Sequence, residues 1–167
     1  MSRLIRFAHG AARAPVLLAV TALFVMMIMT FFDVVLRSTI NTPIEAATEL
    51  TRILMAIVVF SALPVVSGRA GHISVDVLDW VFSRAAARWR DVAINLLSGV
   101  LLWWPAERVT VLAERARSYG DVTEYLGIPQ FYIAWFIAVL TFVTALVLIL
   151  RGLVLAFSPD LVRPADD

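Results

Sequence analysis

APVLLAVTALFVMMIMTFF, residues 14–32 of the chain, is apolar throughout apart from two threonines. An α-helix needs about 20 such residues to cross the roughly 30 Å hydrocarbon core of a bilayer. The whole chain of 167 residues has the same character, with 61% hydrophobic and 16% charged residues, whereas a soluble domain is roughly half apolar and about a quarter charged. We therefore expect an all-α membrane protein that forms a single membrane domain over residues 1–167.

The first apolar run also has features of a signal peptide, because Arg3, Arg6 and Arg13 precede it. However, the run is long for a signal core, and Phe31-Phe32-Asp33-Val34 lacks the small residues of a cleavage site. We expect the run to be retained as a membrane anchor.

Hydropathy predicts four transmembrane helices, and the second and third are weaker than the others. The expected spans are 14–36, 48–67, 92–112 and 130–151. The second is predicted to lie in a helix that begins at Pro43, with Thr42 as the cap and Glu45 closing a capping box. In the third, Asn95, Ser98 and Gly99 favour contact with other helices over contact with lipid.

Residues 73–91 are predicted to form one interfacial amphipathic helix. Their apolar side chains recur at steps of three and four, as on one helical face. Aspartates lie early and arginines late in the segment, which suits the helix dipole. The face could lie in the membrane surface or pack on a partner subunit, and these two alternatives stay open.

The arginines predict the topology of the four spans. Positively charged residues concentrate on the cytoplasmic side of membrane proteins. With the N-terminus inside, nine arginines are cytoplasmic, four lie opposite and Arg108 lies near the opposite border. We expect both termini to be cytoplasmic. The cytoplasmic set comprises Arg3, Arg6, Arg13, Arg69, Arg84, Arg88, Arg90, Arg151 and Arg163, and the opposite set comprises Arg37, Arg52, Arg115 and Arg117.

Four short motifs occur in a characteristic order. Arg37, Asn41 and Pro43 precede Glu49-Leu50-Thr51-Arg52, the glycine-rich turn Gly71-His72-Ile73-Ser74-Val75-Asp76 follows, and Ile128-Pro129-Gln130-Phe131-Tyr132 precedes the last span. In this order, from about Phe32 to Trp135, the chain resembles the small membrane subunit (DctQ type) of TRAP transporters, the tripartite ATP-independent periplasmic transporters. Gln130 departs from the family pattern, in which an aromatic or apolar residue is expected.

The resemblance implies a function in transport. In this family a periplasmic binding protein captures an organic anion, often a carboxylate, and a large polytopic membrane subunit carries it inward with a sodium gradient. The small subunit scaffolds the large one in the inner membrane of a bacterium or archaeon. The resemblance thus implies a large-subunit partner, transient docking of the binding protein and contact with lipid. It implies no enzyme activity, no cofactor and no catalytic, substrate-binding or metal site.

The residues themselves leave two other functions to weigh. A self-sufficient homo-oligomeric transporter or channel would need polar groups that converge in the membrane, and Asp33, Asn95, Ser98 and Glu107 share no obvious face or depth. A redox or haem enzyme is disfavoured because cysteine is absent and both histidines lie outside the spans. The net charge of +1 does not point to nucleic acid.

Charged residues near apolar spans are the candidates for contact with a partner subunit, since such charges are rarely left unpaired. The alternatives are pairing inside the chain, as between Asp33 and Arg37 or between Glu49 and Arg52, and snorkelling to headgroups. A single histidine makes no metal site, so His72 is interpreted as a turn or partner contact. The candidate interface residues are Arg37, Glu49, Arg52, His72, Asp76, Glu107 and Arg108.

Overall fold

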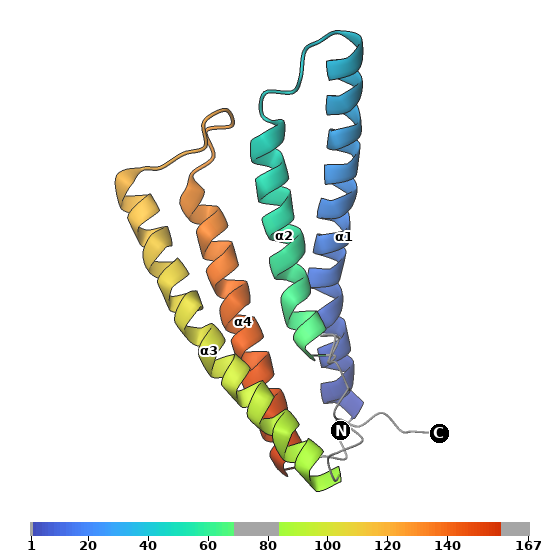
Figure 1. Cartoon of the computed structure of the whole chain (residues 1–167), viewed down its shortest axis with the longest axis vertical. Helices are drawn as coiled ribbons and strands as arrows, with labels where there is room; N and C mark the ends of the chain where they lie inside the picture. The colour runs from blue at the N-terminus through green and yellow to red at the C-terminus, as the bar shows by residue number, and fades with distance from the viewer. Residues whose placement is uncertain (1, 69–83, 158–167) are drawn as a thin grey trace.

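The computed structural model describes residues 2–68 and 84–157, and these form four α-helices (Figure 1). All four helices are long and apolar enough to cross a membrane, which confirms the predicted all-α membrane fold. The helices are α1 (Ser2–Thr39), α2 (Ala47–Gly68), α3 (Arg84–Tyr119) and α4 (Gln130–Phe157).

The helices form two antiparallel hairpins, α1–α2 and α3–α4, which are joined where α2 packs on α4 (Figure 1). Among the described residues, α1 contacts only α2 and α3 contacts only α4. The packing order is therefore α1–α2–α4–α3. In Figure 1 the loops within the two hairpins lie at the upper end, and the start of α1 and the end of α4 lie at the lower end.

Small residues at heptad spacing form the contact between α3 and α4. On α3 the buried positions Val92, Gly99, Ala106 and Ala113 are each seven residues apart, so they form one seam along the helix. The facing residues of α4 are mostly small too, which lets the two backbones approach closely. The buried residues of α4 are Ala138, Thr141, Thr144, Ala145, Leu148 and Gly152.

Gly99 lies at a close approach of α3 and α4. A Cβ atom at this position would lie 2.6 Å from Ile149 Cγ1 and 3.0 Å from the carbonyl oxygen of Ala145. The expectation that Gly99 belongs to a helix–helix contact is therefore confirmed. About one turn farther along α3, Trp103 packs edge-on against Phe142 with the ring centroids 5.0 Å apart.

The predicted start of the second helix was wrong, and the predicted interfacial helix is not confirmed. The second helix begins at Ala47 and not at Pro43, because the Ile44 amide donates to the carboxylate of Asp33 and the chain first forms a turn there. Residues 84–91 of the predicted amphipathic helix are the continuous first turns of α3. The rest of that segment, 73–83, lies outside the described residues, so the interfacial helix is not confirmed.

We predict that Gly99→Ala destabilises the protein by about 1–3 kcal/mol, because the added methyl group overpacks the α3–α4 seam. Gly68→Ala is the matched control. A Cβ at Gly68 would lie at an ordinary 3.5 Å from Val147 Cγ1, so this variant should keep the wild-type melting temperature. Thermal unfolding of both variants in the same detergent provides the measurement. Equal melting temperatures for both variants would contradict the tight contact at Gly99.

Candidate partner interface

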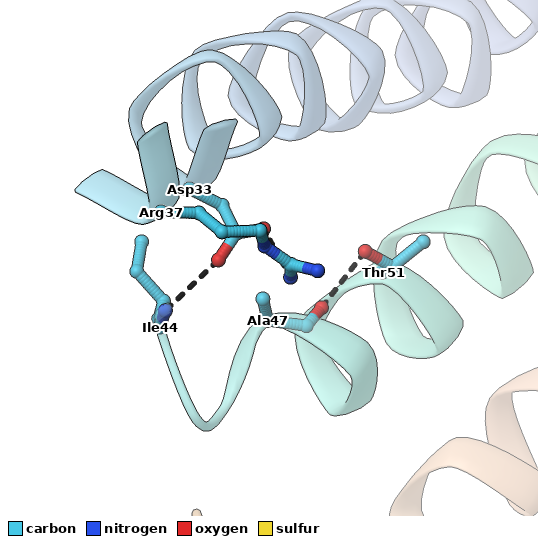
Figure 2. A network of polar contacts seen from close by, with 5 residues as sticks. All are labelled: Asp33, Arg37, Ile44, Ala47 and Thr51. Carbon is cyan, nitrogen blue, oxygen red and sulfur yellow. Dashed lines mark hydrogen bonds and ion pairs between the residues drawn. The ribbon is translucent and has the colours of Figure 1, made fainter. Parts of the chain in front are cut away.

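Asp33 organises the turn between α1 and α2 (Figure 2). Its buried carboxylate accepts a hydrogen bond from Arg37 Nη2 at 2.9 Å through one oxygen and from the Ile44 amide at 2.8 Å through the other. Thr51 then donates to the carbonyl of Ala47 at 2.8 Å in the first turns of α2. The predicted Asp33–Arg37 pair is confirmed. Arg37 is thus engaged within the chain, although its side chain remains 63% exposed.

Glu49 joins the two hairpins at the end where their loops lie. Its two carboxylate oxygens accept hydrogen bonds from the amides of Tyr125 at 2.8 Å and Leu126 at 3.1 Å. Both amides lie in the loop between α3 and α4. Glu49 therefore binds a segment 76 residues away, and the expected pairing with Arg52 is not found among the described residues.

The loop that Glu49 binds is held by its own hydrogen bonds. The amide of Thr123 donates to the carbonyl of Ile128 at 2.9 Å, and the amide of Ile128 donates to Thr123 Oγ1 at 3.0 Å. Gly120 and Gly127 have φ angles of 69° and 62°, a left-handed conformation that glycine adopts without strain. This geometry fixes the amides of Tyr125 and Leu126 where a carboxylate can bind both.

Arg151 joins the hairpins at the opposite end of α2. Its Nη1 donates to the carbonyl of Ser67 at 2.9 Å, in the last turn of α2, where the helix dipole favours a cation. The sequence placed Arg151 only in the cytoplasmic set of arginines and did not predict this contact. A lone arginine at such a position is a signal for a partner in a neighbouring helix.

The remaining candidate interface residues are either exposed or lie outside the described residues. Arg52, Glu107 and Arg108 are exposed, and none of the three forms an ion pair within residues 2–68 and 84–157. His72 and Asp76 lie outside the described residues, so their place at an interface stays a prediction. The described part of the chain also contains no group of three or more acidic, histidine or cysteine residues that could hold a metal ion.

Sequence analysis also missed a repeat on α3. Ala106-Glu107-Arg108 recurs seven residues later as Ala113-Glu114-Arg115. Both alanines are fully buried, and both Glu-Arg steps are exposed. The heptad spacing of the two triplets is the signal that could have revealed this pattern.

A family model for the DctQ component of the tripartite ATP-independent periplasmic transporters matches residues 26–157. The chain belongs to this family. Neither the curated proteins nor the solved structures gave a significant match. The match includes all of α2 and the loops within both hairpins, residues 40–46 and 120–129.

Membership fixes the broad role of this DctQ chain. It is the small component of a TRAP transporter and not an enzyme, and it is a multi-pass protein of the inner membrane. Components of this family work with a large membrane subunit and a substrate-binding protein.

We predict that Asp33→Ala destabilises this chain by about 2 kcal/mol, because the Ile44 amide and Arg37 lose a charged acceptor in a buried position. Arg37→Ala should have a smaller effect, since the arginine side chain is largely exposed. Thermal unfolding in detergent compares the two. A larger loss for Arg37→Ala than for Asp33→Ala would contradict the central role of the carboxylate.

We predict that Glu49→Gln loosens the loop between α3 and α4 without unfolding the helices. The neutral amide offers one acceptor oxygen to two backbone amides, so hydrogen–deuterium exchange at Tyr125 and Leu126 should accelerate several-fold. Glu45→Gln, at an exposed position in the preceding turn, is the control and should leave the exchange unchanged. Unchanged protection of both amides in Glu49→Gln would show that the loop does not depend on this contact.

Proposed function

We propose that the chain is the non-catalytic small permease subunit that scaffolds the large transport subunit of a secondary, sodium-gradient-driven TRAP transporter for organic anions such as carboxylates. Both termini face the cytoplasm in this proposal, and the periplasmic binding protein docks transiently on the assembled membrane subunits. The arginine distribution supports the topology.

One observation carries the non-catalytic part of this proposal. Among the described residues, polar side chains of α3 and α4 donate hydrogen bonds to the backbone of their own helix. Asn95 donates to the carbonyl of Asp91, Thr141 to that of Ile137 and Thr144 to that of Leu140, each one turn earlier in the same helix. A solute or ion pathway needs polar groups that converge in the membrane, whereas each of these three side chains bonds to its own helix.

The exposed surface supports a role as a partner of another membrane protein. The membrane helices α2 and α3 expose Arg52, Glu107 and Arg108, and none of the three forms an ion pair within the described residues. The proposed contacts with the large subunit comprise the exposed Arg52, Glu107 and Arg108, together with His72 and Asp76 outside the described residues. Arg37 and Glu49 support this surface from within, through the turn and the loop that they hold.

We predict that the tagged chain, purified from its native membranes in mild detergent, recovers a large polytopic permease in stoichiometric amount. In liposomes, the two membrane subunits with the binding protein should take up a carboxylate only under an inward sodium gradient. The chain alone should give no uptake above empty liposomes, because the proposal assigns the transport pathway to the large subunit.

Mass spectrometry of the purified complex and uptake of radiolabelled solute are the measurements. Recovery of the chain as a homo-oligomer that transports by itself would overturn the proposal. Sodium-independent uptake by the complete system would contradict only the proposed use of a sodium gradient.

A further inference from the structure

Glu107 and Arg108 lie halfway along α3 and are exposed on the surface of the chain. They follow Trp103-Trp104-Pro105, and α3 continues beyond them to Tyr119. No residue of the described chain forms an ion pair with either of them. The adjacent side chains of Glu107 and Arg108 do not form an ion pair with each other either.

The register of α3 against α4 gives the depth of these two charges. Trp103 packs on Phe142, and the guanidinium of Arg117 lies 6.0 Å from the ring centroid of Phe131. Interpolation between these two antiparallel contacts places Glu107 level with the α4 segment 138–139.

That level is the middle of the apolar layer and not its border, where the arginine distribution predicts Arg108. In α4 the run 131–150 contains no charged residue and matches the hydrocarbon thickness of about 30 Å. Its centre is near residues 140–141, so Glu107 and Arg108 lie within roughly 3 Å of the bilayer midplane at a rise of about 1.5 Å per residue. The α2 contacts agree, because Glu49 meets the loop that precedes this run and Ser67 meets Arg151 directly after it.

The seam on α3 turns Arg108 away from the rest of the chain. Ala106 is fully buried, and α3 contacts only α4 among the described helices. At about 100° per residue, Arg108 lies roughly 200° around the helix from Ala106, and Glu107 lies on the flank between them. Arg108 therefore faces outward from the four-helix unit at mid-depth.

Lipid is a poor environment for these charges. The midplane lies about 15 Å from either headgroup layer, farther than an arginine side chain extends by snorkelling. Charged residues at such depth pair with other protein groups and mark functional surfaces.

We propose that this outward face of α3 docks a transmembrane helix of the large TRAP subunit, which presents an acidic side chain to Arg108 and a basic or hydrogen-bond-donating side chain to Glu107 near the bilayer midplane. The inference rests on the proposed scaffold function and assigns it a surface. A second copy of this chain fits less well. Two copies share one orientation in the membrane, so a symmetric contact through this face would set Arg108 against Arg108 at the same depth.

The test compares Arg108→Gln with Arg115→Gln, in tagged chains purified from native membranes. Arg115 is the matched control, because it has the same side chain and the same face but lies seven residues, about 10 Å, nearer the end of α3, within reach of headgroups. Arg108→Gln should lower the recovered large subunit at least about tenfold, because it leaves a buried acid of the partner unpaired. Arg115→Gln should recover the wild-type amount within roughly twofold, since its charge can be solvated, and Arg108→Lys should restore most of the recovery.

A photoreactive amino acid at position 104, on the same face in the otherwise unchanged chain, tests the surface even if Arg108→Gln fails to fold. We expect it to crosslink to the large subunit. Crosslinking to a second copy of this chain, or no crosslink while the large subunit still co-purifies, would overturn the proposal. If wild type and Arg108→Gln recover equal amounts of the large subunit, the ion pair at Arg108 is refuted and the scaffold function is not. If wild type recovers no large subunit, the scaffold function is refuted, and the ion pair with it.

Discussion

The attachment of α2 to the α3–α4 hairpin determines how the two halves of this protein are placed. Burial of apolar surface does little to join helices in lipid, and α2 buries little of its apolar window. Besides the packing of α2 on α4, two polar contacts define the attachment, one from Glu49 to the loop amides and one from Arg151 to the Ser67 carbonyl. They lie about 27 Å apart along α2 at 1.5 Å per residue, close to the hydrocarbon thickness. Since α1 contacts only α2 among the described helices, its position depends on the same two contacts.

Helix count and approximate span positions could be predicted from the sequence because apolar runs are local signals. The partners of the polar residues could not, since they depend on packing between distant segments. Glu49 binds a loop 76 residues away and not Arg52 three residues away. The helix start at Pro43 looked sound locally, but Asp33, eleven residues earlier, binds the Ile44 amide and delays the helix to Ala47. Asp33–Arg37, one turn apart, was the charge pair that local reasoning could find.

The two faces of α3 follow from one sequence repeat. Ala106 and Ala113 occupy the seam with α4, where a larger side chain would separate the helices, as the short distances around Gly99 indicate. Each alanine is followed by Glu-Arg. Since successive residues are about 100° apart around the helix, these charges face outward where the alanine faces α4. Close packing inside the subunit and charge on its outer surface are thus geometrically linked. If the buried positions of α3 moved by one residue along the sequence, the close packing on α4 and the outward position of the charges would both be lost.

The two outer helices meet different surroundings. In the packing order α1–α2–α4–α3, each end helix has one neighbour among the described residues and exposes its other sides. The run 14–32 of α1 carries no charge and exposes large apolar side chains around the helix, which suits lipid. At comparable depth, α3 exposes Glu107 and Arg108, which lipid accommodates poorly. The asymmetry favours an arrangement in which α1 faces the bilayer and α3 faces the large subunit.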